Sequence, residues 1–261
     1  MSQPAAVALG AIAGGTIFLG LPVARMRGLP TAVQGFLNAF ATGILVFLLW
    51  DILSHAGPPV EAAVVGAPRS NLSGPAMAAI FAGGIGAGLI GLVYFNRAIF
   101  GRLRKEAHAP GPRNLAMAIA TGLGLHNLSE GLAIGESAHA GAIAFAGVLV
   151  VGFALHNITE GFGIAAPMTT DPKPVSWGFL GLAGLIGGGP TFLGTVIGHS
   201  WVSPALEVFF FALAAGSILY VVIELAAVCR RYAMPVLVTW MILLGIALGF
   251  ATDFVLTAAG A

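Results

Sequence analysis

The sequence predicts an all-α integral membrane protein with eight transmembrane helices. Of its 261 residues, 58% are hydrophobic and only 8% are charged, and the mean hydropathy is +0.96. Soluble domains carry about 25% charged residues, so this chain has too few to cover a surface that faces water. Eight apolar segments approach the ~20 residues that a helix needs to cross a bilayer. They run over 5–24, 31–55, 75–96, 114–136, 142–166, 176–199, 204–228 and 235–258.

The ends of these segments indicate a single transmembrane domain over 1–261. No basic residue precedes the first segment, and Arg25 and Arg27 follow it, which is the reverse of a secretory signal. We therefore expect the first segment to be a helix of the protein. Several later connections are too short to hold a folded domain. In the sixth segment three glycines precede Pro190, and a residue that cannot continue the helical hydrogen bonds predicts a kink there.

The placement of basic residues predicts the orientation of the chain. In an eight-segment topology, ten of the eleven lysines and arginines fall on one side and only Arg69 falls on the other. Such an excess faces the cytoplasm. We therefore expect both termini outside, in a multi-pass protein of the cell (inner) membrane. The ten residues are Arg25, Arg27, Arg97, Arg102, Arg104, Lys105, Arg113, Lys173, Arg230 and Arg231.

A polar motif occurs twice inside these apolar segments. H-N-L-S-E-G at 126–131 recurs as H-N-I-T-E-G at 156–161. A histidine and a glutamate four residues apart share one face of a helix, and ionisable groups in a membrane span are candidates for a functional site. Imidazole nitrogen and carboxylate oxygen are good ligands for zinc and similar dications. The candidate ligands are His126, Glu130, His156 and Glu160, and Asn127 and Asn157 would add an oxygen or orient a ligand.

The same polar groups have a simpler interpretation, in which they bond to one another and join two helices. One copy of the motif would leave this alternative strong, and the second copy weakens it. Because the fourth and fifth segments run in opposite directions with the same motif, a two-fold axis in the membrane plane can relate them. Extending that axis to the three segments on either side predicts a 3+2+3 inverted repeat, as in many secondary transporters.

Four other polar residues are candidates for a transport pathway. Asp51 and His55 lie near the outer end of the second segment, where the mouth of a pathway and a hydrated interface are equally consistent with the sequence. Glu224 lies toward the inner end of the seventh segment, and a pathway role is slightly favoured there. Asn38 is interpreted as a packing residue first and as a pathway residue second.

Together these features resemble the ZIP (Zrt/Irt-like) family of divalent-metal transporters. The resemblance rests on H-N-x-x-E-G motifs in spans four and five of an eight-span chain with both termini outside, and it extends to 35–56 and 215–224. It implies import of Zn²⁺ into the cytoplasm by alternating access between two helix bundles. It also implies that His126, Glu130 and Glu160 are transport-site ligands, with His156 a neighbour or a further ligand.

The sequence departs from the family pattern at four positions. Ser129 and Thr159 stand where the family has proline, and their hydroxyls can bend a helix more mildly by bonding to a carbonyl four residues earlier. Asn157 and Gly189 stand where two-metal members of the family carry acids. Without those two charges we expect one bound ion.

The sequence leaves several identities open. Zn²⁺ is the expected cargo, but Fe²⁺, Mn²⁺, Co²⁺ and Cd²⁺ accept the same ligands. The lipid bilayer is the other expected partner, nucleic acid is not expected, and a homodimer is left open. One rival function is a metal-independent transporter of protons or organic solutes. A second, an intramembrane metalloenzyme, is weaker because Asn127 and Asn157 stand where H-E-x-x-H enzymes have a glutamate base, so we do not expect an enzyme.

Overall fold

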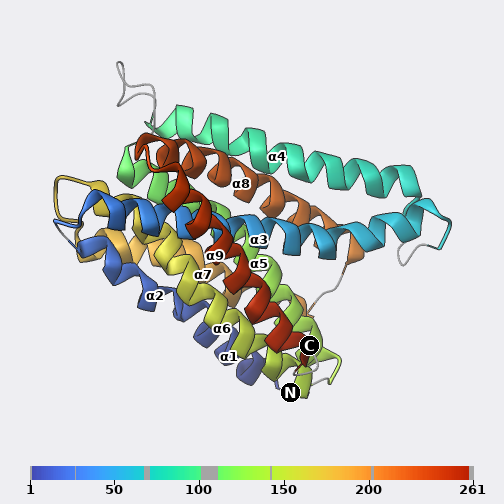
Figure 1. Ribbon diagram of the computed structural model, residues 1–261. Helices are drawn as coiled ribbons and strands as arrows, with labels where there is room; N and C mark the ends of the chain where they lie inside the picture. Colours follow the sequence, from blue (N-terminus) through green and yellow to red (C-terminus); the bar gives the residue numbers. More distant parts are fainter. Residues whose placement is uncertain are drawn as a thin grey trace.

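The computed structural model describes residues 2–26, 28–67, 71–100, 111–141, 143–200 and 203–258, and over these ranges the chain forms helices and no strand (Figure 1). Each apolar segment marked in the sequence corresponds to a helical stretch, which confirms the all-α prediction. In chain order the elements are α1 (Gln3–Gly15), α2 (Ile17–Gly20), η1 (Leu21–Arg25), α3 (Thr31–Val64), α4 (Gly74–Phe100), α5 (Pro112–His139), α6 (Ile143–Ala165), η3 (Ala166–Thr170), α7 (Trp177–Ser200), α8 (Pro204–Arg231) and α9 (Pro235–Ala258).

Seven helical stretches in the described residues are long and apolar enough to cross a membrane, as in a multi-pass membrane protein. They are 3–25, 31–64, 74–94, 149–170, 177–200, 204–231 and 235–255. Helix α5 has 28 residues but is not among them. Its sequence includes His126, Glu130 and Glu136, which lower its hydropathy. Crossing by α5, and with it the count of eight spans, stays a prediction.

The first segment is not one helix, as the sequence predicted, but a broken one. The hydroxyl of Thr16 lies 2.7 Å from the carbonyl oxygens of Ala13 and Ala154, and the regular helix α1 ends just before it. A threonine hydroxyl competes in this way for backbone carbonyls. Pro22, in η1, has no N–H for the turn that precedes it. The two residues together account for the change from α1 to α2 and then to η1.

The helices form two groups. We call α1, α2, α5, α6 and α7 the first bundle, in which α5 packs most extensively against α7, and we call α3, α4, α8 and α9 the second bundle. The bundles meet mainly where α5 packs on α8 and α3 on α6. Apolar residues fill this junction: the largest buried cluster includes Ile17 and Ile119 from the first bundle and Phe47 and Ile218 from the second.

Glycines allow close approach of helices within the first bundle. A Cβ atom at Gly131 would collide with the carbonyl oxygen of Thr191 on α7, and one at Gly161 would collide with that of Ile17 on α2. The glycine after each motif glutamate is therefore a packing residue, in line with the small-residue interfaces of membrane helices. Pro190 lies inside the continuous helix α7, and the kink that the sequence predicts there stays a prediction.

Several basic residues gather at one end of the molecule. Arg113 Nε lies 2.7 Å from Asp171 Oδ2, in the connection that contains Lys173. Arg25 donates to the carbonyl of Val175 in the same connection. Arg25, Arg113 and Lys173 therefore lie around one connection, and the side of the membrane that they face stays a prediction. The expected sites at Arg27, Arg69, Arg102, Arg104 and Lys105 lie outside the described residues. Figure 1 shows that α1 begins and α9 ends near each other, at one end of the molecule.

Candidate metal centre

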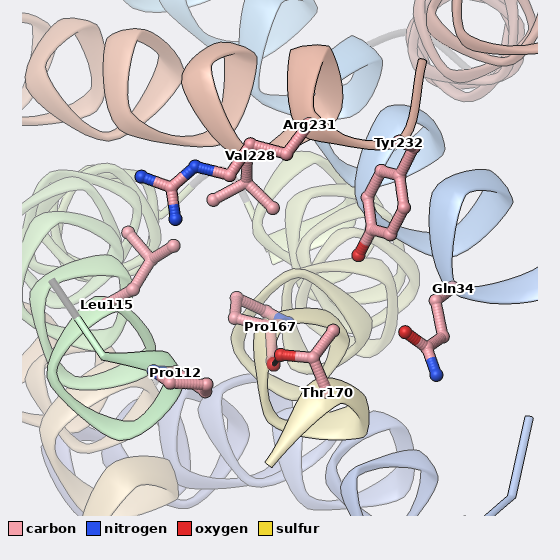
Figure 2. A pocket seen from close by; sticks show the side chains of 8 residues that line it. All are labelled: Gln34, Pro112, Leu115, Pro167, Thr170, Val228, Arg231 and Tyr232. Atoms are coloured by element: carbon pink, nitrogen blue, oxygen red, sulfur yellow. Dashed lines mark hydrogen bonds between the residues drawn. The ribbon is translucent and has the colours of Figure 1, made fainter. Parts of the chain in front are cut away.

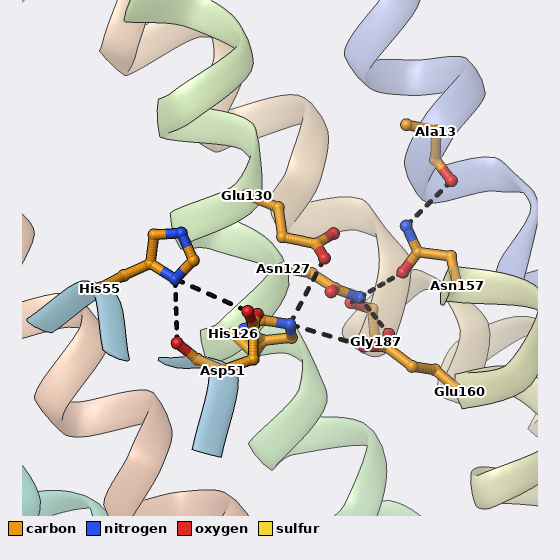
Figure 3. A network of polar contacts seen from close by, with 9 residues as sticks. All are labelled: Ala13, Asp51, His55, His126, Asn127, Glu130, Asn157, Glu160 and Gly187. Carbon is orange, nitrogen blue, oxygen red and sulfur yellow. Dashed lines mark hydrogen bonds and ion pairs between the residues drawn. The ribbon is translucent and has the colours of Figure 1, made fainter. Parts of the chain in front are cut away.

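Three ligand atoms converge between α5 and α6. Nε2 of His126 lies 3.4 Å from Oε1 of Glu130, one turn along α5, and 3.9 Å from Oε1 of Glu160 on α6 (Figure 3). All three ligand atoms lie within 4.8 Å of one another. The three residues are 3%, 4% and 1% exposed, so the group is shut off from water. The 126–130 spacing predicted the α5 pair, and the second motif predicted Glu160.

The spacing of these atoms suits a small dication. Nitrogen and oxygen ligands about 2.0–2.1 Å from Zn²⁺ at a tetrahedral angle lie about 3.4 Å apart. The His126–Glu130 distance equals this value, and the His126–Glu160 distance of 3.9 Å is within a small side-chain rotation of it. Two carboxylates would balance the charge of a dication bound by a neutral imidazole. The arrangement can therefore hold one metal ion with a fourth position left for water.

The buried polar atoms at this centre lack hydrogen-bond partners. Both ring nitrogens of His126, Oε2 of Glu130 and Oε1 of Glu160 have none. Burying such groups without partners is costly, and each case in a folded protein calls for an explanation such as a bound ion. The simpler interpretation, in which the polar groups bond to one another, therefore leaves these four atoms unexplained.

That interpretation does describe the two asparagines. Nδ2 of Asn127 lies 2.8 Å from Oδ1 of Asn157, 2.8 Å from Oε2 of Glu160 and 3.0 Å from the carbonyl oxygen of Gly187. Nδ2 of Asn157 donates to the carbonyl of Ala13 over 3.1 Å. Figure 3 shows this network beside the three-ligand group. Sequence spacing identified both asparagines but not the carbonyls of Ala13 and Gly187, because any residue type carries a backbone carbonyl.

His156, the fourth candidate ligand, lies on α6, but its side chain falls outside the described residues. Its role as a ligand stays a prediction. The three-ligand group therefore takes a histidine and a glutamate from the first copy of the motif and a glutamate from the second.

The predicted pathway residues lie at different places. Asp51 and His55 form an ion pair of 3.7 Å on α3, where the side chains are 20% and 61% exposed. Glu224 lies half-buried on α8 and is not in the three-ligand group. Asn38 is fully buried and donates to the hydroxyl of Tyr232 over 3.1 Å, which fits the packing role favoured by the sequence.

A cavity of about 280 Å³ lies between the two bundles (Figure 2). Its walls come from α3, α5, η3 and α8, and Arg231 places it at the end where the basic residues gather. It is lined by Gln34, Pro112, Leu115, Pro167, Thr170, Val228, Arg231 and Tyr232.

Neither models of known protein families nor curated protein sequences match this chain. The functional argument therefore rests on the residues and geometry of the centre. These show a helical protein of membrane type with a buried His/Glu group that fits a metal ion.

Proposed function

We propose that this protein is a transporter that carries Zn²⁺, or a related divalent transition metal, across a membrane through the His126–Glu130–Glu160 centre. The observation that carries the proposal is the set of buried ligand atoms without hydrogen-bond partners, held among helices of membrane-spanning type. Ionisable groups in a membrane interior commonly mark an ion pathway. A dication bound among the three side chains would supply a partner for Nε2 of His126 and for Oε1 of Glu160.

Helix packing supports the 3+2+3 inverted repeat on which such transport would operate. The repeat pairs α5 with α6, α3 with α8, α4 with α9, and the first helical segment with α7. Contacts follow this pairing: α4 packs on α8 as α9 packs on α3, and α5 packs on α8 as α6 packs on α3. The eighth crossing, by α5, belongs to this proposal.

The two bundles suggest how the centre would be exposed to each side in turn. All three ligands belong to the first bundle, while an apolar junction and a cavity lie between the bundles. Relative movement of the bundles would expose the site without taking the ligands apart. The cavity is at the basic end, which the positive-inside rule assigns to the cytoplasm. The proposed direction, import through the cell (inner) membrane, comes from the resemblance to ZIP transporters.

The rival functions receive less support. An enzyme of the H-E-x-x-H type needs a base beside the histidine, and here Asn127 fills that position with its amide bonded to acceptors. A metal-independent transporter would leave the unpartnered nitrogens and oxygens of the centre without an explanation.

Uptake by proteoliposomes tests the proposal. The full chain is reconstituted, and entry of Zn²⁺ is followed with an enclosed fluorescent indicator, with Glu160→Gln as the comparison because it keeps the shape and removes the charge. We expect uptake by the wild type and at least a tenfold loss in the variant at matched reconstitution, on the order of the losses seen for weakened metal sites. Absence of uptake of Zn²⁺ and of the related dications by the wild type would reject the proposed function.

A further inference from the structure

We propose that Asn127 sets the metal selectivity of the centre by limiting Glu160 to a single coordinating oxygen. This inference rests on the metal transport proposed above. It assigns Asn127 a positioning role beside the metal in place of a role as a ligand.

The contacts of Asn127 fix the orientation of its side-chain amide. The three atoms around Nδ2 are Oδ1 of Asn157, Oε2 of Glu160 and the carbonyl oxygen of Gly187, and all are hydrogen-bond acceptors. A rotated amide would place Oδ1 against three oxygen atoms. Asn127 therefore presents a donor to Glu160.

The two oxygens of Glu160 consequently differ. Oε2 accepts the hydrogen bond from Asn127 over 2.8 Å. Oε1 faces Nε2 of His126 at 3.9 Å and has no hydrogen-bond partner. A carboxylate must turn both oxygens to an ion to bind it in bidentate fashion. The amide takes one lone-pair site of Oε2 and holds that oxygen toward the asparagines, so Glu160 presents Oε1 to the metal.

Asn157 keeps Asn127 in this position. Its Oδ1 accepts from Asn127, and its Nδ2 donates to the carbonyl of Ala13, in the last turn of α1. Both asparagines are fully buried, so moving either would leave buried polar groups unpaired. With the bond to Gly187, the network joins α1, α5, α6 and α7, and its geometry is set by the packing of the whole first bundle.

Selectivity follows from coordination number. Glu130 is not restrained in the same way, since its Oε2 has no partner. With Glu160 held to one oxygen, the centre offers few ligands and suits Zn²⁺, which takes four. Mn²⁺ prefers an octahedral shell rich in oxygen. Releasing Oε2 of Glu160 would add an oxygen ligand and shift the preference toward Mn²⁺.

Competition between Zn²⁺ and Mn²⁺ tests this inference on the purified full chain. Binding affinities and uptake rates for both ions are compared in the wild type, in Asn127→Ala and in Thr121→Val. The Thr121 hydroxyl bonds the carbonyl of Met117 within the same helix, so its replacement is a matched control. In Asn127→Ala we expect the affinity for Zn²⁺ to fall about 10- to 100-fold, as for other lost supporting bonds, and the affinity for Mn²⁺ to change less. Thr121→Val should leave both values unchanged.

Infrared spectroscopy supplies a test that needs no folded variant. In the wild type, Zn²⁺ binding should produce a carboxylate band pair with the wide separation of single-oxygen coordination. In Asn127→Ala the separation should narrow as Glu160 turns both oxygens to the ion. Absence of a single-oxygen signature from the wild type would overturn the inference.

The outcomes separate this inference from the proposed function. Equal losses of Zn²⁺ and Mn²⁺ affinity in Asn127→Ala would show that Asn127 is a direct ligand or only supports folding, and would overturn the selectivity role. If the wild type transports Zn²⁺ but the ratio of Zn²⁺ affinity to Mn²⁺ affinity is unchanged in Asn127→Ala, the selectivity role is also overturned. The proposed metal transport would not be affected by that result. If the wild type neither binds nor transports either ion, the proposed function itself fails.

Discussion

Nε2 of His126 lies 3.4 Å from Oε1 of Glu130, one helical turn further along α5. The pair presents a neutral ligand and an anionic ligand from one rigid element, and Glu160 completes the group from α6. Because two of the three ligands belong to the same helix, their spacing does not depend on how α5 sits against its neighbours.

Replacing Glu130 by glutamine should remove tight metal binding. The amide keeps the size of the side chain but takes away one of the two charges that offset a dication. We expect the wild type to hold one Zn²⁺ per chain and Glu130→Gln to bind at least tenfold more weakly, as measured by equilibrium dialysis with elemental analysis. Asn157 and Gly189 add no charge for a second ion, so two closely spaced, fully occupied zinc peaks in anomalous scattering would contradict this prediction.

Two adjacent glycines of α7 should respond in opposite ways to alanine. A Cβ at Gly188 would collide with the carbonyl oxygen of Gly14 on α1, while a Cβ at Gly189 would meet nothing within 4 Å. We expect Gly188→Ala to lower the thermal unfolding temperature in detergent. Gly189→Ala should leave it unchanged or raise it, because alanine favours a helix by about 1 kcal/mol over glycine. Equal effects of the two changes would show that α1 and α7 do not pack as described.

The ion pair between Arg113 and Asp171 should make stability depend on pH. Partial burial raises the pKa of Asp171, but hydrogen bonds from the Lys173 amide and from Arg113, with the positive charges nearby, outweigh burial and hold the pKa below its usual value. A carboxyl group whose pKa is lowered by folding stabilises the folded state above its unfolded pKa of about 3.9, and this contribution is lost as the pH falls through the folded pKa.

Asp171→Asn should therefore be less stable than the wild type at pH 7, by about 1 kcal/mol or less for a partly exposed pair. The difference should begin to shrink on acidification below about pH 4 and should disappear as the pH falls through the lowered pKa of folded Asp171. Thermal unfolding across this pH range measures the effect. In an Arg113→Gln background the Asp171→Asn change should cost less, and an unchanged cost there would mean that the pair does not act as a unit.

Cysteine labelling should place the connection between α3 and α4 opposite the one between η3 and α7. Ser73 and Lys173 are both exposed and lie in these two connections. In a Cys229→Ser background, we expect a membrane-impermeant thiol reagent added to intact cells to label Ser73→Cys and not Lys173→Cys. Equal labelling of the two positions in intact cells would rule out the eight-span topology.

The sequence predicted the helices well because hydropathy and segment length act locally. All eight apolar segments correspond to helical stretches, and three residues of the doubled motif, His126, Glu130 and Glu160, lie together in the structure. The break at Thr16 was missed. The break coincides with a hydrogen bond from the Thr16 hydroxyl to the carbonyl of Ala154, which is more than a hundred residues away in the sequence. No local sequence pattern reveals such a contact.

Contacts between helices set the limit on prediction. The repeat showed that Asn127 and Asn157 lie near the candidate ligands but did not show that they bond to each other. Nor did it show that Gly131 and Gly161 touch the backbones of α7 and α2. Periodicity says which residues share a face of one helix, while these features depend on which helices meet.

The modest hydropathy of α5 has a consequence for biogenesis. This helix carries two of the three proposed ligands, yet it is not among the stretches apolar enough to span a membrane by composition. The insertion machinery retains a segment in lipid according to its apolar character. In the proposed eight-span arrangement, helix α5 would therefore depend on later-synthesised neighbours, above all α7, to hold it in place. A chain that stops after α5 would lack that support, so the helix with two of the three proposed ligands would be secured only after α7 has been made.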